Sequence, residues 1–343
     1  MATCRGAFFA GPERLELREF ELPPMGRRDV LLRVAACGVC GSDLHQFHGR
    51  WPQPEVVIGH EVGAIVEEVG PDVTRVRPGD KVAVEPILRC GECRYCLTGR
   101  YLLCSSGQFL SVGVHGGFAG KMVVPAYCCH KLNEGTDATL GAFGEPLSVG
   151  LHAVRIAEAN GDDTVLVLGA GTIGLMTVAA ARALGAGRVI VTAKYPHQQQ
   201  VAKRLGADIV LAPGEGVVDE VRSICPEGPD IVVETVGTVG GVIQQALQVV
   251  RKLGTVVLVG GITDPSELDL QPIIFHELRV LGSPCYGQVG TKQDFEIAAQ
   301  LISDGTVDVA SLVSARYPLD EVQQAFVAAD DKGKGAIKVL VEG

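Results

Sequence analysis

Several features are scarce in the 343-residue sequence. Aromatic residues make up 5% of it, and tryptophan occurs once. The net charge is −10, and the sequence contains no long run of basic residues. The lack of a basic cluster argues against a nucleic-acid partner. The first twenty residues contain no long apolar stretch, so no signal peptide is predicted. Residues 164–181 carry no charge, but three glycines break their first half, which favours a buried strand, turn and helix over a membrane span. We expect a cytoplasmic protein without a membrane partner.

The composition is that of a two-domain globular protein. Hydrophobic residues make up 47% and charged residues 20%, and the length exceeds that of one ordinary core. The eleven cysteines are an odd number in a chain too large for a secreted disulfide scaffold. They therefore indicate metal sites in a cytosolic protein.

The hydrophobic pattern changes near residue 150. Residues 1–150 contain short strands separated by Gly and Pro turns, which predicts a small β-barrel or sandwich. Residues 151–284 alternate apolar strands with helices, which predicts a parallel sheet covered on both faces. The tail, 285–343, contains one helix and a final strand and is expected to return to the first domain. Six strand candidates cover 164–170, 188–193, 208–212, 230–235, 254–260 and 278–283, with helices at 171–184, 196–205, 239–250 and 291–305.

A glycine turn follows the first of these six strands. Gly169, Gly171 and Gly174 form G-x-G-x-x-G between a strand and a long apolar helix. The first glycine permits a tight turn, the second lets the backbone approach a pyrophosphate, and the third lets the helix pack on the strand. The helix N-terminus then binds the anion. The motif predicts a dinucleotide site, the alternative being a turn of the same shape without a ligand.

The next strand ends without the acidic residue that normally binds the ribose of NAD. About 20 residues beyond the glycine turn stand Ala193 and Lys194. Ala193 leaves space, and Lys194 brings a positive charge close to where a 2′-phosphate would lie. This pair predicts a preference for NADP, with NAD still possible, unless Lys194 is merely a solvated side chain.

Four cysteines lie close together in the first domain. Cys90, Cys93, Cys96 and Cys104 form C-x2-C-x2-C-x7-C. Four thiolates at such spacing predict a closed tetrahedral zinc site of structural type. An iron–sulfur centre and a disulfide pair are the alternatives.

A second group of potential metal ligands is dispersed along the chain. "CGVCGSDLH" contains Cys40, Ser42, Asp43 and His45, "GHEVG" contains His60 and Glu61, and "GEPLSVGLH" contains Glu145. Each residue alone is weak evidence. Together they provide a thiolate, an imidazole and carboxylates with room for water or substrate, as catalytic zinc requires.

These motifs resemble those of the zinc-dependent medium-chain dehydrogenase/reductase family, and most closely its polyol (sorbitol-type) dehydrogenases. The matching segments are "GVCGSDLH", "GHEVGAIVEEVG", "GDKVAVEP", the four-cysteine lobe, "GEPLSVGLHA" and "GAGTIG", in family order and over nearly the whole chain. The resemblance implies an α/β plus β protein: a GroES-like catalytic domain (1–150 with 285–343) and a Rossmann domain (151–284) with a six-stranded doubly wound sheet.

The resemblance also implies roles for single residues. Cys40 and His60 would bind the catalytic zinc, and Glu61 would be the third ligand or its close neighbour. Glu145 stands where relatives have a further ligand or a neighbouring carboxylate. Ser42 would take the substrate hydroxyl proton, and His45 would pass it to solvent. With the four-cysteine site, two zinc ions per chain are expected.

Contacts with the cofactor and the substrate are expected at two further sets of residues. Cofactor contacts are expected at Gly169, Gly171, Thr172, Ile173, Gly174, Ala193, Lys194, Val236, Val259 and Gly260. Substrate contacts are expected at Gln46, Phe47, Trp51, Phe118 and Tyr286, each of which could equally serve packing.

The implied activity is reversible hydride transfer between a secondary alcohol (a polyol, sugar or diol) and NAD(P), with NADP preferred. The alternatives are an NAD-dependent threonine- or butanediol-type dehydrogenase, a zinc-free quinone or enoyl reductase, and a non-catalytic binding protein on the same fold. Apolar segments at 254–262 and 276–283 favour pairing of subunits through the Rossmann sheet, and a tetramer is expected rather than a dimer.

Overall fold

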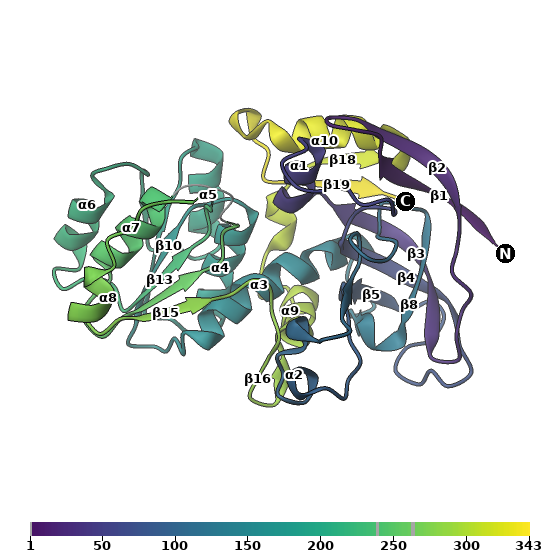
Figure 1. Cartoon of the computed structure of the whole chain (residues 1–343), viewed down its shortest axis with the longest axis horizontal. Helices are drawn as coiled ribbons and strands as arrows, with labels where there is room; N and C mark the ends of the chain where they lie inside the picture. The colour runs from purple at the N-terminus through teal and green to yellow at the C-terminus, as the bar shows by residue number, and fades with distance from the viewer. Residues whose placement is uncertain (1, 238–239, 262–264) are drawn as a thin grey trace. The chain divides into compact units, whose positions relative to one another are not determined.

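The computed structural model describes residues 2–237, 240–261 and 265–343 (Figure 1). The chain forms two compact units, residues 1–145 with 295–343 and residues 146–294. The boundaries thus differ from the expected 150 and 285, because they fall in the first turns of α3 (Gly144–Ile156) and α9 (Asp294–Ser303). The segment before α9 belongs to the second unit, since Asp294 accepts hydrogen bonds from His152 and Arg155 of α3.

The first unit is built on a seven-stranded sheet that joins both ends of the chain. Its strand order is β18-β19-β3-β4-β5-β9, with β8 also paired to β3. The strands are β3 (Asp29–Gly38), β4 (Glu61–Val69), β5 (Lys81–Val84), β8 (Lys121–Pro125), β9 (Cys129–Lys131), β18 (Val313–Pro318) and β19 (Lys338–Glu342). Antiparallel pairing of β19 with β3 confirms that the tail returns to this unit.

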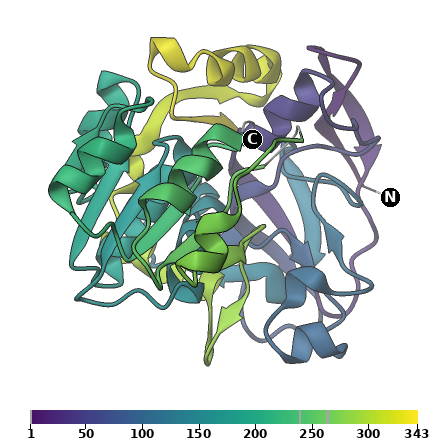
Figure 2. The ribbon, with the colours of Figure 1, turned by 60° about the vertical axis from the view of Figure 1, so that its left-hand side comes forward.

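A hairpin and a C-terminal helix also belong to the first unit. The hairpin strands are β1 (Thr3–Phe9) and β2 (Leu15–Glu21), and α10 (Val322–Asp330) lies next to β2, where Gln323 accepts a hydrogen bond from the Leu15 N–H at 2.8 Å. Figure 2 shows this yellow C-terminal helix beside the purple N-terminal segment.

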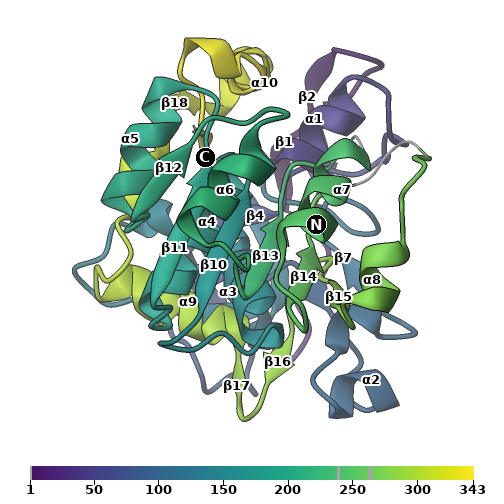
Figure 3. The same cartoon turned by 90° about the vertical axis from the view of Figure 1, so that its left-hand side faces the viewer.

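The second unit contains a six-stranded, entirely parallel sheet, as predicted. Its order is β12-β11-β10-β13-β14-β15 (Figure 3). Successive strands of the chain are added on one side of β10 as far as β12 and then, from β13, on the other side of β10. The strands are β10 (Thr164–Leu168), β11 (Arg188–Thr192), β12 (Ile209–Leu211), β13 (Ile231–Glu234), β14 (Thr255–Leu258) and β15 (Arg279–Gly282). This is the doubly wound order whose switch point binds ligands at the carboxyl ends of the strands.

Helices connect the six strands. They are α4 (Thr172–Ala183), α5 (Pro196–Arg204), α6 (Val217–Ile224), α7 (Gly240–Val249) and α8 (Gln271–Phe275). Val239 of the predicted third helix and Ile262 of the predicted pairing segment lie outside the described residues. Leu166, Val232 and Val256 of the sheet are fully buried in one cluster with residues of α6 and α7. No helix within the described ranges is both long and apolar enough to cross a membrane.

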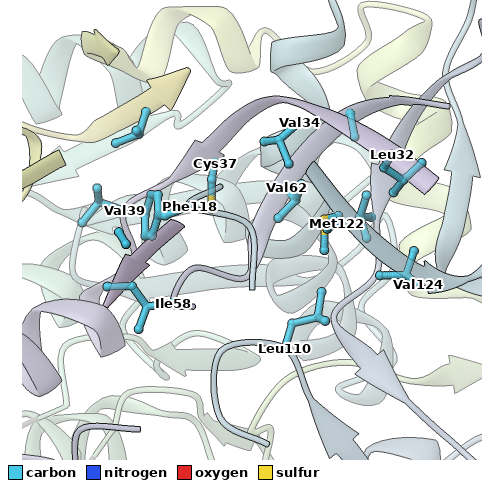
Figure 4. Packing of buried hydrophobic residues seen from close by; sticks show 14 of the residues in the cluster. Leu32, Val34, Cys37, Val39, Ile58, Val62, Leu110, Phe118, Met122 and Val124 are labelled. Carbon is cyan, nitrogen blue, oxygen red and sulfur yellow. The ribbon is translucent and has the colours of Figure 1, made fainter. Parts of the chain in front are cut away.

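The core of the first unit fixes the start of α3. Val34, Val62, Phe118 and Met122 pack in this core (Figure 4). On β4, Gly63 lies so close to the 3-10 helix η3 (Ala138–Phe143) that an added Cβ would stand 2.2 Å from the carbonyl oxygen of Ala138. The missing side chain lets η3 rest on the strand, and α3 with Glu145 follows directly.

Candidate functional site

Three of the predicted metal ligands come together in the first unit. Ligand atoms of Cys40, His60 and Glu61 all lie within 4.8 Å of one another. The antiparallel register brings them together, because Gly38 at the end of β3 pairs with Glu61 at the start of β4. Cys40 follows that strand and precedes α1 (Gly41–Phe47), and His60 directly precedes β4. A thiol, an imidazole and a carboxylate converging in this way fit a catalytic zinc ion.

Asp43 supports this cluster. Its Oδ1 lies 3.6 Å from Nδ1 of His60, and its Oδ2 accepts a hydrogen bond from the backbone N–H of Cys40 at 2.9 Å. Burial alone would lower the pKa of His60, but the negative charges of Asp43 and Cys40 outweigh it and raise this pKa well above its usual value. The surroundings thus favour a positive charge at this point. A carboxylate behind a histidine is a common support for a metal ligand, although the sequence assigned Asp43 no specific role.

Glu61 has a buried cation as its partner. Lys338 of β19 donates from Nζ to Oε2 of Glu61 and to the carbonyl oxygen of Val39, the latter at 2.9 Å. The other oxygen, Oε1, is buried and accepts no hydrogen bond within the described part of the chain. One oxygen of Glu61 is therefore fixed by the ion pair, while the second is available to a metal ion. The signal that could have identified Lys338 is a lone lysine in the apolar strand "AIKVLVE", since buried lysines need partners.

Glu145 and Cys37 lie near the cluster without joining it. Glu145 is buried in the first turn of α3, and burial raises its pKa to about 7, with His60 lowering it and Glu61 raising it further. The charges of His60 and Glu61 therefore act on Glu145. The group of ligand atoms within 4.8 Å of one another nevertheless contains only Cys40, His60 and Glu61. Burial raises the pKa of the Cys37 thiol well above its usual value, which suits a packed thiol in the core.

The two predicted proton-transfer residues are both on α1. Ser42 is half-buried, and the ring of His45 stacks on Trp51 with a centroid distance of 4.9 Å and an interplanar angle of 24°. Burial lowers the pKa of His45, and the nearby cations Arg50 and Lys332 lower it further. A neutral imidazole can accept a proton, which agrees with the role expected of this residue.

The structure places two of the expected substrate residues in the core of the first unit. Phe47 and Phe118 are 3% and 1% exposed, and both pack against Phe326 in the core at centroid distances of 5.4 Å. Their burial favours the packing role that the sequence left open for both rings.

Gln46 and Trp51 are placed differently from these two rings. Gln46 donates a hydrogen bond to the Pro52 carbonyl oxygen at 3.3 Å, which orders the loop that carries Trp51. Tyr286 belongs to the second unit and is buried there.

The four-cysteine lobe forms a second cluster. Its sulfur atoms lie 3.5 Å (Cys90–Cys104), 3.6 Å (Cys93–Cys96) and 3.9 Å (Cys90–Cys96) apart. Four sulfurs around one tetrahedral zinc, each at about 2.3 Å, would be about 3.8 Å apart. These separations exclude disulfides among the four, and all are free cysteines. Backbone N–H groups, that of Cys96 first, lower the pKa of Cys93 to about 6, which favours a thiolate ligand.

The glycine turn of the second unit has the expected geometry. Gly169 has a φ of +103°, a backbone conformation that favours glycine. A Cβ on Gly174 would stand 2.0 Å from the carbonyl oxygen of Gly169, whereas Gly171 faces open space. Thr172 and Ile173 form the first turn of α4 just beyond. Helix and strand thus pack closely, while the open space at Gly171 lets an anion approach the N-terminus of α4.

Other predicted cofactor residues lie at the carboxyl ends of neighbouring strands. Val236 follows β13 and is 44% exposed, and Val259 and Gly260 follow β14. Glu234, which the sequence analysis missed, is fully buried, and its Oε1 accepts hydrogen bonds from the backbone N–H groups of Val236 and Gly237 at 2.7 and 2.8 Å. This carboxylate shapes the loop that follows β13.

No acidic residue stands directly after β11, where one would bind the ribose of NAD. Ala193 is 1% exposed, and Lys194 is exposed with no carboxylate partner among the described residues. The backbone N–H of Gly169 donates to Oγ1 of Thr192 at 2.8 Å, so the end of β11 is connected to the glycine turn.

Comparison with known proteins places these sites in a family. Residues 26–134 match the alcohol dehydrogenase GroES-like domain, and residues 172–304 match the family described as zinc-binding dehydrogenase. The sorbitol dehydrogenase of Arabidopsis thaliana is 35% identical over 351 residues, which cover 97% of this chain and 94% of that protein. The L-idonate 5-dehydrogenase of Vitis vinifera is 33% identical, with 97% and 93% covered.

A solved structure is similar over its full length. A protein of Sinorhizobium meliloti 1021, described as a zinc-binding dehydrogenase and bound to NADP, superposes with a TM-score of 0.91 at 32% identity, with both chains covered completely. The metal cluster of the first unit and the glycine turn of the second are the parts that such a dehydrogenase requires. The chain therefore belongs to the zinc-dependent medium-chain dehydrogenase family and is an enzyme of its polyol-dehydrogenase type.

Proposed function

We propose that the chain catalyses the reversible oxidation of a secondary hydroxyl group of a polyol, sugar or diol, with NADP as the preferred cofactor. The observation that carries this proposal is the convergence of Cys40, His60 and Glu61, supported by Asp43 and Lys338. The names of the relatives, a sorbitol and an L-idonate dehydrogenase, support a hydroxylated substrate.

Two zinc ions per chain fit the residues present. Cys40, His60 and Glu61 would hold the catalytic ion, with Glu145 as the nearby alternative carboxylate. Cys90, Cys93, Cys96 and Cys104 would hold the structural ion. When bound, zinc supplies a Lewis acid for the substrate oxygen, and the dinucleotide supplies the hydride acceptor.

The side chains of the protein bind, orient and move protons. Ser42 would accept the proton of the substrate hydroxyl, and neutral His45, stacked on Trp51, would pass it to solvent. Asp43 orients His60, and Lys338 fixes one oxygen of Glu61. Gln46 and Trp51 remain candidates for substrate contact, and Tyr286 of the second unit is a third.

The preference for NADP depends on the end of β11. Ala193 can neither bond a ribose 2′-hydroxyl through a carboxylate nor repel a 2′-phosphate, and exposed Lys194 can attract one. The NADP found in the similar Sinorhizobium meliloti protein supports this assignment.

A panel of polyols, sugars, diols and threonine, each assayed with NADP and with NAD, tests the proposal. We expect turnover of at least one polyol, sugar or diol, with a higher kcat/KM for NADP than for NAD. A higher kcat/KM with NAD would overturn the cofactor preference and favour the threonine- or butanediol-type alternative. Absence of turnover across the panel, in protein that contains both metal ions, would favour a non-catalytic binding protein.

A further inference from the structure

The turn that carries Lys194 is held by hydrogen bonds on both sides. The backbone N–H of Ala193 donates to the Leu211 carbonyl oxygen at 2.9 Å, and Nε2 of Gln199 donates to the Ala193 carbonyl oxygen at 3.2 Å. On the other side, the backbone N–H of Tyr195 donates to Oε1 of Gln198 at 3.3 Å. The backbone at Lys194 is thus fixed between the end of β11 and the first turn of α5.

The side chain of Lys194 lies over an aromatic ring. Its Nζ is 5.4 Å from the centroid of the Tyr195 ring, within the range of a cation–π interaction. Since no carboxylate pairs with Lys194 among the described residues, this ring is what holds the ammonium group in place.

The Tyr195 ring is itself held. It stacks on the ring of His197 with a centroid distance of 5.6 Å and an interplanar angle of 14°. A free lysine loses much rotamer entropy when it binds a phosphate, and this loss reduces the affinity gained from its charge. A lysine whose head already lies over a fixed ring loses less.

We propose that Tyr195 is a positioning residue for cofactor choice. Its ring holds the ammonium group of Lys194 in advance at the end of β11, where the phosphate on the ribose 2′-oxygen of NADP arrives. The inference rests on the proposed NADP preference and adds to it. Lys194 supplies the positive charge, and Tyr195 increases the difference in affinity between NADP and NAD that this charge produces. Tyr195 itself need not touch the phosphate.

Binding of reduced cofactors to the zinc-loaded enzyme tests this proposal. Dissociation constants for NADPH and NADH are measured by nicotinamide fluorescence for the wild type, Lys194→Ala, Tyr195→Leu, Tyr195→Phe and the double variant Lys194→Ala/Tyr195→Leu. We expect Tyr195→Leu to weaken NADPH binding about two- to fivefold, the range of an exposed cation–π contact, and to leave NADH binding unchanged. Tyr195→Phe, which keeps the ring face, should bind both cofactors like the wild type. In the Lys194→Ala background, Tyr195→Leu should have no further effect.

Each other outcome has one meaning. If Lys194→Ala weakens NADPH binding but Tyr195→Leu does not, the positioning role is wrong and the NADP preference stands. If Lys194→Ala leaves the ratio of NADPH to NADH affinity unchanged, the proposed preference itself fails. Equal weakening of both cofactors by Tyr195→Leu would indicate a general role in the fold of α5 and would also overturn the inference. Should Tyr195→Leu fail to fold, Tyr195→Met removes the ring in its place.

Discussion

At the scale of single residues, the cluster depends on charges that the chain supplies from distant positions. Lys338 and Glu61 form an ion pair in which both side chains are almost completely buried, at 2% and 1% exposure. Lys338 also donates to the Val39 carbonyl oxygen, so its two partners come from two separate segments of the chain. A buried pair of this kind is costly to break, because the remaining charge stays without a partner.

We therefore predict that Lys338→Met destabilises the enzyme by about 3–5 kcal/mol, the cost of leaving Glu61 buried and unpaired. Urea unfolding followed by circular dichroism measures this change. The double variant Glu61→Gln/Lys338→Met should recover part of the loss, since it leaves no lone charge. Lys334→Met, at an exposed lysine on the same tail, is the matched control and should change stability by less than about 1 kcal/mol. Equal losses for Lys338→Met and Lys334→Met would contradict the prediction.

At the scale of elements, the sequence predicted strands better than amphipathic segments with few apolar residues. All six strands of the parallel sheet were predicted, because strands buried on both faces are uninterrupted apolar runs. Helix α6 was missed, since in "VVDEVRSI" only Val217 and Val221 are buried and charged residues separate them. The β1–β2 hairpin was missed because charged residues alternate through β2.

The site could be predicted where its residues stand in short motifs. Cys40, His60 and Glu61 were found in this way, and the structure brings them together. Short motifs could not reveal the ion pair of Lys338, because its partner Glu61 lies near the other end of the chain. Only the pairing of β19 with β3 brings the two side chains together. The sequence left substrate contact and packing open for Phe47 and Phe118, because their contacts with Phe326 are long-range.

The four-cysteine lobe is an element whose order should depend on metal. Its α2 (Arg94–Leu97) has no buried residue. Arg89 connects the lobe to the strand region before it, because its guanidinium lies 4.0 Å from the Tyr101 ring centroid and donates to Glu85. We predict two zinc ions per chain in the wild type and about one in Cys104→Ser, measured by elemental analysis. Removal of one thiolate opens a closed site, whereas Cys40, His60 and Glu61 of the other cluster are untouched. Ser106→Ala in the same loop is the control and should keep both ions. A wild type with at most one zinc ion would contradict the prediction.

At the scale of the whole molecule, one edge of the parallel sheet is exposed and apolar. Among the described residues, strand β15 pairs only with β14, at the end of the sheet (Figure 3). Val280 on this strand is 37% exposed. On neighbouring α8, Ile274 and Phe275 are 70% and 75% exposed. An open edge strand beside exposed apolar side chains favours pairing with another chain. The expected tetramer would use this edge for one of its interfaces.

We predict that Val280→Asp lowers the molar mass measured by light scattering, from that of a tetramer to that of a dimer or monomer, because a charge at the centre of the edge would be buried without a partner. Val327→Asp, at an exposed valine on α10 of the first unit, is the matched control and should leave the mass unchanged. A wild type that is monomeric at micromolar concentration would show that this edge does not pair.

The pairing of β19 with β3 also determines when the site can be completed. The second unit is continuous in sequence and interrupts the first, so the seven-stranded sheet is completed only after residues on both sides of that unit meet. Until β19 is in place, Glu61 lacks the ammonium group that fixes one of its oxygens. During synthesis, residues 146–294 can fold before the last strand of the first unit, β19, has been made. Completion of the candidate metal cluster is thereby coupled to the last stage of chain folding.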